Sequence, residues 1–132
     1  MAIGFDKGFE LHAKGMQLRA QRAEVISGNI ANADTPNYKA KGMDFDKAMQ
    51  QANLQQQSGM SRTNSKHFDV RTELNNNVDF RIPDQPDTGD GNTVDVQVER
   101  NLYLENSLEY QAGVQFLSGK IKALQKVISG GR

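Results

Sequence analysis

The sequence has no cysteine and no tryptophan, and few aromatic residues of any kind. Without cysteine the chain can form no disulfide, no zinc–thiolate centre and no thiol nucleophile. Hydrophobic residues make up only 36% of the 132 residues and aromatic residues 7%, so the core available to one isolated chain is small. A chain with so small a core gains order by packing against copies of itself or against partners.

The charges of the chain balance. Lysine plus arginine and aspartate plus glutamate each number 16, which gives a formal net charge of zero. This balance argues against a nucleic-acid binder that neutralises phosphates, and it favours self-association. Residues 1–9 have no basic start followed by an apolar run, and no stretch is long and apolar enough to span a membrane. The residues alone therefore predict no cleaved signal peptide, and they favour the cytoplasm.

Residue patterns typical of catalysis are also lacking. The only two histidines, His12 and His67, lie far apart in the sequence, and neither has a neighbouring triad arrangement. We expect His12 on the polar part of the first helix and His67 at the start of a strand. The glycines before Lys120 are spaced one residue too far apart for a phosphate loop, and Ile121 replaces the required hydroxyl. The sequence predicts no enzyme, no cofactor, no metal and no small-molecule substrate.

The first long helix is predicted from Phe9 to Ala33, with residues 1–8 loose because two glycines weaken a helix there. Apolar residues recur every seven positions in two columns: Phe9, Met16, Ala23 and Ile30, and Leu11, Leu18 and Val25. Positions two apart are separated by about 200° around a helix, so the helix needs cover on two sides. We expect a neighbouring subunit to cover the second side, and Arg19, Arg22 and Glu24 to lie on the remaining solvated or inter-subunit surface.

The end of this helix is marked by Pro36, which cannot donate a backbone hydrogen bond and disfavours the helical conformation of Thr35. Asp34 and Thr35 are suited to cap a fresh turn with Pro36 at its first position. Asn29 and Asn32 are poor residues for a helix interior, because their amides compete for backbone groups. Two explanations stay open, a fraying polar helix end or side chains required for specific contacts.

The middle of the chain is predicted to be less regular. A weak helix is expected over residues 40–57, and a flexible loop over 53–65, where Gln, Ser, Asn and Gly dominate. Apolar and polar residues alternate over 68–72 and 78–82 with three asparagines between them, which predicts a short β-hairpin. Pro83 and Pro86 end the second strand, and a turn-rich linker follows up to Asn92.

The last helix is predicted from Val94 to Ile128, with Thr93 as its cap and Gly130-Gly131 as its stop. Its apolar residues follow the alternating four-and-three spacing of a coiled-coil seam: Tyr103, Ser107, Tyr110, Val114, Leu117, Ile121, Leu124 and Ile128. We expect these residues, with Leu11, Leu18 and Val25, to form the helix-pairing and subunit interfaces.

The predicted fold is therefore mainly α. Long N- and C-terminal helices pair as a coiled coil, and a short β-hairpin and flexible loops occupy the middle segment. The chain divides into an N-terminal helix with its polar end (1–39), a middle segment (40–92) and a C-terminal coiled-coil helix (93–132), which together form one structural unit.

The string from Asn29 to Lys39 resembles the N-terminal signature of bacterial flagellar axial proteins, the rod and hook family. Six positions carry the resemblance: Asn29, Asn32, Asp34, Thr35, Pro36 and Tyr38. Asn37 departs from the family pattern, which usually has glycine, but asparagine tolerates a left-handed conformation. The short length, Asp44-Phe45, the Asp90–Asp95 segment and the diglycine end are most similar to the basal-body rod proteins of this family. The match covers both ends of the chain and leaves the middle unmatched.

The resemblance implies a structural subunit of the proximal rod, which polymerises through its terminal helices into a drive shaft that transmits torque. The six matched residues would fix the helix end and its contacts with neighbours. The implied partners are copies of the chain, other rod proteins, the membrane-ring/rod junction protein and the flagellar type III export apparatus. The implied location is the periplasmic part of the basal body, reached without signal cleavage. The alternatives are a sibling rod subunit and a soluble coiled-coil adaptor or export chaperone, which would form a stable discrete dimer.

Overall fold

The computed structural model describes residues 5–57, 78–82 and 89–130. Along the chain the elements are α1 (Phe5–Ala31), β1 (Lys41–Met43), α2 (Phe45–Gln57), β2 (Val78–Phe80) and α3 (Val96–Ile128). The prediction of a mainly α chain with long terminal helices and a small β element is confirmed. The first predicted strand, the turn after it and most of the predicted loop lie outside the described residues. Within the described part, no helix is long and apolar enough to cross a membrane.

Helix α1 begins at Phe5, so the expectation of a loose segment is wrong for residues 5–8. A glycine inside a helix costs about 1 kcal/mol relative to alanine, and the strong helix formers around Gly8 outweigh that cost. The helix ends at Ala31, two residues before the predicted end, and turns occupy residues 32–37. Most of the residues that resemble the axial-protein signature, 29–39, lie in or next to these turns.

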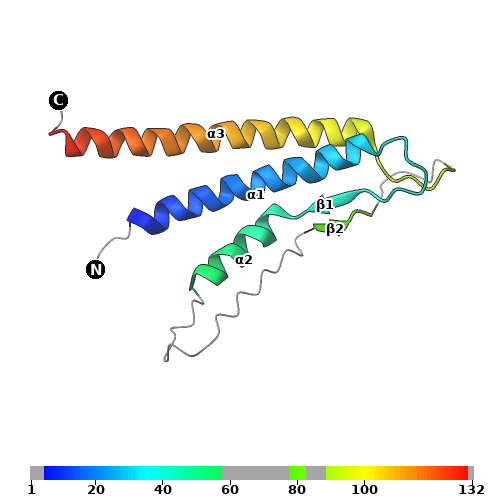
Figure 1. Cartoon of the computed structure of the whole chain (residues 1–132), viewed down its shortest axis with the longest axis horizontal. Coiled ribbons are helices and arrows are strands. Elements are labelled where there is room, and N and C mark those ends of the chain that lie inside the picture. Colours follow the sequence, from blue (N-terminus) through cyan, green and yellow to red (C-terminus); the bar gives the residue numbers. More distant parts are fainter. Residues whose placement is uncertain (1–4, 58–77, 83–88, 131–132) are drawn as a thin grey trace.

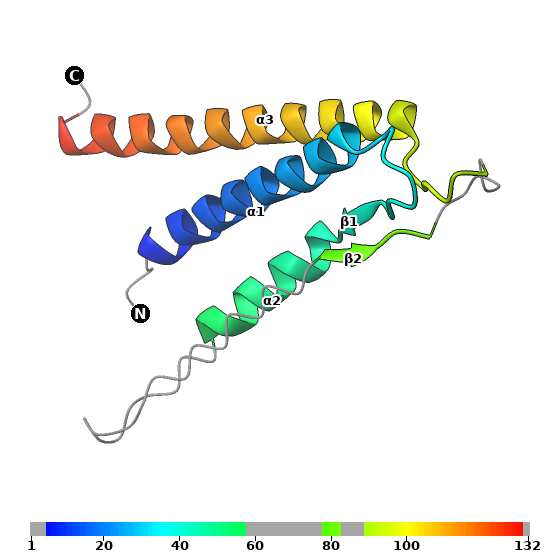
Figure 2. The ribbon, with the colours of Figure 1, turned by 45° about the vertical axis from the view of Figure 1, so that its right-hand side comes forward.

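Helices α1 and α3 pack against each other, and both termini of the described chain lie at the end remote from their connection. The two helices lie close together where α1 ends and α3 begins, and they separate toward the opposite end (Figures 1 and 2). A Cβ placed on Gly113 of α3 would lie 3.7 Å from Met16 Cγ of α1, so this glycine permits a close approach. Buried apolar side chains are small in number and size, with Leu18 and Ile26 the largest in the described core.

The other side of α1 is covered by α2 and β1 of the same chain. Gly15 of α1 is buried, and a Cβ placed there would lie 3.4 Å from Met49 Cε of α2. The sequence correctly predicts a helix that needs cover on two sides. The expectation that a neighbouring subunit supplies the second cover is wrong for this part of α1, because the short middle elements supply it.

The β-sheet joins strands that are distant in the sequence. β1 pairs antiparallel with β2, with Lys41 opposite Phe80 and Met43 opposite Val78. The strand at 78–80 confirms part of the predicted second strand, whereas residues 41–43 were predicted to be helical and are not. The reason is Asp44, whose Oδ1 accepts the Lys47 amide at 3.1 Å and so caps α2 one residue before it begins. This amide and the Lys47 ammonium hold the pKa of the Asp44 carboxyl below its usual value.

The cap of α3 is Asp95, so the assignment of this role to Thr93 is wrong. Asp95 Oδ1 accepts from the amides of Gln97 at 2.9 Å and Val98 at 3.3 Å. Thr93 lies in an extended segment, where its hydroxyl accepts the Ala40 amide at 2.8 Å. The predicted end at Ile128 is confirmed, and Gly130 follows with a φ of 75°.

Candidate assembly site at the helix junction

The residues that carry the signature lie where α1 ends, and the segment before α3 lies directly against them (Figure 1). We call residues 29–41 and 90–95 together the junction. Many of the hydrogen bonds that connect the end of α1 to the segment before α3 are made in the junction.

Asn29 is fully buried and acts on the backbone of β1. Its Nδ2 donates to the Lys41 carbonyl at 2.7 Å, and its Oδ1 accepts the Lys41 amide at 3.0 Å. The Tyr38 hydroxyl lies 3.4 Å from the same Oδ1. The side-chain amide thus pairs with both polar groups of one peptide residue, as a neighbouring strand would. Of the two explanations for this asparagine, the structure supports the one that requires it for specific contacts.

Asn32 closes the end of the helix. Its Nδ2 donates to the Gly28 carbonyl at 2.8 Å, and the Thr35 hydroxyl donates to its Oδ1 at 3.2 Å. The Tyr38 amide then donates to the Thr35 carbonyl at 3.3 Å. Asn37 has a φ of 61°, and with Pro36 before it this segment has the features of a type II β-turn.

The fresh helical turn expected at Asp34, Thr35 and Pro36 is therefore absent, because the β-turn takes its place. Asp34 and Pro36 are exposed, as is Thr35. The left-handed conformation at Asn37 shows why the family's usual glycine can be replaced by asparagine here.

Asn92 is the central residue of the junction, and the sequence analysis did not identify it. Its buried Nδ2 lies within hydrogen-bond distance of three carbonyl oxygens, those of Asn32 at 3.0 Å, Ala33 at 2.7 Å and Thr35 at 2.9 Å. These carbonyls lack helical partners because α1 has ended. Its Oδ1 accepts the Val94 amide at 2.8 Å, so one side chain connects the end of α1 to the approach to α3. The Asp90–Asp95 resemblance contained this residue, but its role depends on contacts far apart in the sequence.

The two segments of the junction are also joined through their backbones. The Asn37 amide donates to the Asp90 carbonyl at 2.9 Å, and the Thr93 amide donates to the Tyr38 carbonyl at 3.0 Å. The Lys39 ammonium donates to the Gly91 carbonyl at 2.7 Å. The junction is thus a set of mutually satisfied polar groups that fixes the chain in one path.

Replacing Gly91 by alanine is expected to lower the free energy of unfolding by more than the same change at Gly89. Gly91 has a φ of 72°, and a Cβ there would lie 2.5 Å from Asn37 Oδ1. Gly89 has a φ of 90°, and a Cβ there would meet nothing within 4 Å. Both variants therefore include the backbone strain, about 1–2 kcal/mol, and in Gly91→Ala the end of the exposed Asn37 side chain must also move. Urea unfolding measures both, and a smaller loss in Gly91→Ala than in Gly89→Ala would contradict the expected order.

A buried ion pair connects the middle segment to α3. Arg81, which follows β2, places its Nη1 2.8 Å from Oε1 of the fully buried Glu99. The Arg81 amide donates to the Ala40 carbonyl at 2.8 Å, so the same residue also extends the β1–β2 pairing. Oε2 of Glu99 is buried without a hydrogen-bond partner in the described structure. No spacing in the sequence indicates this pair, because its residues belong to different elements.

A second polar cluster lies between the helices. Asn106 of α3 donates from Nδ2 to the Arg19 carbonyl of α1 at 2.9 Å. Arg19 Nε lies 3.3 Å from Glu109 Oε2, within ion-pair distance but without hydrogen-bond alignment, and its guanidinium stacks over Phe45 at 4.3 Å. Arg19 is therefore half-buried between three helices, and its predicted place on a solvated or inter-subunit face is wrong. For Glu24 the same prediction is confirmed, because its side chain is exposed.

The predicted seam residues occupy two environments. On α1, Leu18 is buried and Leu11 and Val25 are half-buried. On α3, Leu117 and Leu124 are half-buried, whereas Tyr103, Tyr110, Val114, Ile121 and Ile128 are exposed. The contacts of α3 with α1 include Asn106, Glu109, Gly113 and Lys120. Each of these four positions lies one residue before a predicted seam position, whereas Leu117 and Leu124 of the predicted seam are themselves half-buried.

His12 lies on the α1 side of this contact. Its Nε2 is 2.7 Å from the Lys120 ammonium in an exposed contact, so the half-buried ring faces α3 at a polar position of α1, as predicted. His67 lies outside the described residues. Among the described residues no three His, Asp or Glu side chains gather as a metal site requires. The polar groups of the junction satisfy one another, which is an arrangement suited to holding shape.

Comparison with known proteins places these features in one family. The sequence model of the family described as flagella basal body rod protein matches residues 9–39, which span α1 and the signature. The chain is 49% identical to the flagellar basal body rod protein FlgB of Aeromonas hydrophila, over 98% of each chain. It is 39% identical to FlgB of Escherichia coli K12 and 37% identical to FlgB of Salmonella typhimurium, over 96% of each chain. The chain therefore belongs to the FlgB family of flagellar basal body rod proteins, whose members are structural subunits of the rod and not enzymes.

Proposed function

We propose that this rod subunit polymerises with copies of itself and with other rod proteins through the outer surfaces of its two long helices. The observation that supports this most directly is an apolar stripe on α3, made of Tyr103, Tyr110, Val114 and Ile121. Their side chains are 38% to 44% exposed in the single chain. A row of large apolar residues left half-covered marks a surface that another protein covers.

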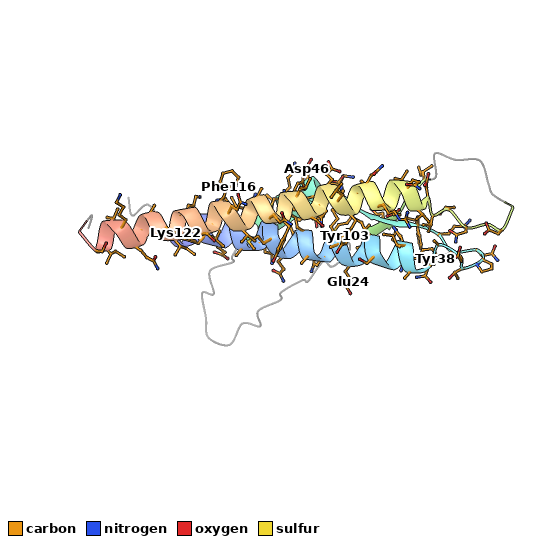
Figure 3. The ribbon with its side chains drawn as sticks, turned by 90° about the horizontal axis from the view of Figure 1, so that it is seen from above. Glu24, Tyr38, Asp46, Tyr103, Phe116 and Lys122 are labelled. Carbon is orange, nitrogen blue, oxygen red and sulfur yellow. The ribbon has the colours of Figure 1, made fainter. Side chains whose placement is uncertain are left out.

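The stripe lies beside α1. Tyr103 lies on the side of α3 on which Glu24 of α1 lies, while Phe116 lies on the side of Asp46 (Figure 3). On α1, Met16 lies opposite Gly113, where an added Cβ would come within 3.7 Å of Met16 Cγ, and the positions four and seven residues beyond Met16 are Ala20 and Ala23. A large apolar row on one helix thus adjoins small residues on the other, and such a pair of surfaces is suited to receive a further helix.

The mechanical role follows from the junction. A drive shaft must transmit torque without bending, so each subunit must keep its two helices in a fixed relation. The signature residues Asn29, Asn32, Thr35 and Tyr38 do this within the subunit, while the exposed Asp34 and Pro36 are available to neighbours. In this proposal segments 1–39 and 93–132 build the shaft, and the middle segment 40–92 makes outward, subunit-specific contacts.

The chain acts in the flagellar basal body. We further propose the periplasm as its site of assembly, export through the flagellar type III apparatus without signal cleavage, and contact with the membrane-ring/rod junction protein. These steps are implications of the family resemblance. Intact-mass measurement of the subunit from purified basal bodies tests the export step, since a shortened N-terminus would contradict it.

Val114→Glu is expected to abolish rod assembly and motility. Its side chain lies in the stripe, where a carboxylate would have to be desolvated against an apolar neighbour. Motility and basal-body yield are measured in a strain that lacks its own subunit, and far-UV circular dichroism of the purified chain checks the fold. Gln115→Glu adds the same charge one residue further along an exposed side of α3 and is expected to assemble. Parental motility of the Val114→Glu strain would contradict the proposed interface.

A further inference from the structure

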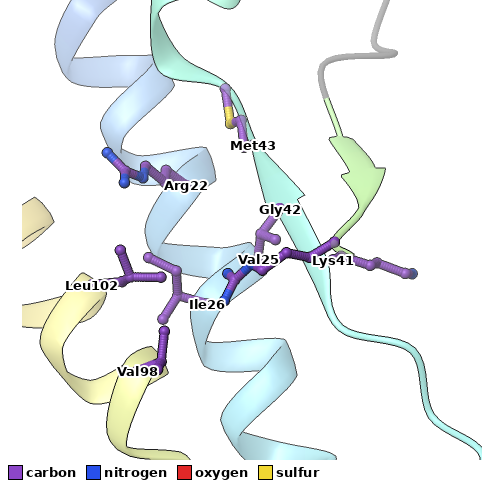
Figure 4. Close-up of a pocket in the computed structure, with 9 residues that line it drawn as sticks. Arg22, Val25, Ile26, Lys41, Gly42, Met43, Val98 and Leu102 are labelled. Carbon is purple, nitrogen blue, oxygen red and sulfur yellow. The ribbon is translucent and has the colours of Figure 1, made fainter. Parts of the chain in front are cut away.

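The outer edge of β2 is not paired within the part of the chain that the structure describes. Figure 4 looks into the pocket between α1, β1 and α3 and shows β2 on the side of β1 that is remote from α1. The Arg81 amide donates to the Ala40 carbonyl, so Asp79 and Arg81 direct their backbone groups toward β1. The alternate residues direct theirs toward the outer edge: Val78, Phe80 and Ile82.

The side chains of these three residues are also left uncovered in the described structure. Val78 is 39% exposed, Phe80 70% and Ile82 86%. They share one side of the strand, because successive side chains of a strand point to opposite faces. An unpaired edge with apolar side chains accepts a further strand, and a sheet of only two strands is marginal without one. The outer edge of β2 is therefore a docking surface for an extended segment.

The segment best placed to dock there belongs to the same chain. Residues 58–77 lie outside the described residues, and they end directly at Val78, the first residue of β2. Residues 68–72 read Phe-Asp-Val-Arg-Thr, with the alternation of a strand that has one apolar side. A segment tethered this closely has an effective concentration on the order of millimolar. We propose that residues 68–72 add to the outer edge of β2 as a third antiparallel strand, with Val70 opposite Phe80.

The charges of the two segments support this register. In it, Arg71 is opposite Asp79. Two residues further along the pairing, Asp69 is opposite Arg81. Both pairs occupy the positions where side chains of an antiparallel sheet lie closest, and opposite charges directly across stabilise the pairing. Arg81 then lies between the Glu99 carboxylate, 2.8 Å away, and the Asp69 carboxylate, and its guanidinium has enough donors for both.

Neighbouring registers lack these pairs. A shift of two residues in one direction places Asp69 opposite Asp79, and a shift of two in the other direction places Arg71 opposite Arg81. Like charges directly opposite each other are destabilising. A shift of one residue places apolar side chains opposite charged ones. The charge pattern therefore selects one register, and residues 73–77 become a five-residue loop, one of the common hairpin lengths.

A covered β2 edge keeps rod subunits from pairing through their sheets, a role that rests on the self-assembly proposed above. In a polymer each subunit lies at high local concentration beside its copies, and an open β edge would pair with the edge of a neighbour. Residues 68–72 cover this edge within each subunit, so contacts between copies are left to the helices and the outer loops.

Disulfide formation in the purified, unassembled chain tests the register, since the chain has no native cysteine. Three variants share Asp79→Cys and add Asp69→Cys, Arg71→Cys or Glu73→Cys. Alkylation and mass spectrometry measure the intramolecular disulfide in a glutathione buffer at high dilution. Only residue 71 is directly opposite residue 79, within bridging distance, so its disulfide equilibrium constant is expected to exceed the other two on the order of tenfold. Loop closure alone would favour the shorter 73–79 pair instead.

Equal constants for the three pairs, or the largest constant for residue 69 or 73, would overturn the proposal. None of these outcomes bears on the rod function, because no assembly takes place in the experiment. Val70→Pro tests the covering of the edge, because it removes the amide that donates to the Phe80 carbonyl in this register. This variant is expected to aggregate faster than the control Ser61→Pro, measured by light scattering at equal concentration. Equal rates would overturn the covering role.

Discussion

Asn29→Asp is expected to lower the free energy of unfolding by about 3 kcal/mol, one of the two largest effects in the chain. The shape of the side chain is retained, but the donor to the Lys41 carbonyl becomes an acceptor, and a charge is introduced at a fully buried position. Urea unfolding of the purified chain, followed by far-UV circular dichroism, measures the loss.

The pH dependence of this variant identifies the cause. Burial raises the pKa of a carboxyl, so the new side chain favours the protonated state in the folded chain. A protonated carboxyl can donate to the Lys41 carbonyl. The deficit should therefore shrink as the pH falls from the raised pKa of the folded chain toward the ordinary aspartate value of about 4, and it should be smallest below that value. Asn101→Asp, at an exposed position of α3, is the matched control and should stay within about 0.5 kcal/mol of the parent. Equal losses in the two variants would show that the Asn29 contacts contribute nothing specific.

Arg81→Met is expected to cost about 3–5 kcal/mol, because it leaves Glu99 charged, fully buried and without its partner. The same unfolding experiment applies. Since the Arg81 amide still donates to the Ala40 carbonyl, the β1–β2 connection itself is retained in this variant.

The double variant Arg81→Met/Glu99→Leu separates the ion pair from general packing. Replacing both charges by apolar residues of similar size removes the unpaired carboxylate, so most of the stability should return. If the double variant is as unstable as Arg81→Met alone, the loss of stability comes from changed packing around residues 81 and 99, and the ion pair is not its cause.

The sequence predicted those parts of the fold that depend on local patterns. The presence of two long terminal helices and the end of α3 at Ile128 follow from helix formers and the diglycine, whereas α1 begins four residues and ends two residues before its predicted bounds. Two faces of α1 need cover, as predicted. The family resemblance, carried by residues 29–39, is confirmed by full-length relatives. The relatives named above are basal-body rod proteins, as the Asp90–Asp95 segment indicated. None of these relatives is named as an adaptor or a chaperone.

What sequence reasoning missed depends on contacts between distant residues. Residues 41–43 have helix-compatible neighbours, and they form a strand because Asp44 caps α2 after them and because Asn29 and β2 pair with them. Thr93 has a side chain suited to cap a helix, but its hydroxyl accepts a hydrogen bond from the Ala40 amide. Asp95 caps α3 instead. Only part of the predicted seam faces α1, because Asn106, Glu109 and Gly113, which carry no large apolar side chain, lie against α1 in place of their apolar neighbours, and their contacts could not be predicted from an apolar spacing.

Three of the buried polar side chains in the described structure are the asparagines 29, 92 and 106. An amide carries no charge and does not titrate, so its hydrogen bonds are neither screened by salt nor broken by acid in the physiological range. Two of these amides, those of Asn92 and Asn106, therefore hold the two long helices together at both salt and pH extremes at which the Arg19–Glu109 ion pair weakens. A swimming cell that passes from fresh to saline or from neutral to acidic water would keep this part of the subunit geometry in its shaft.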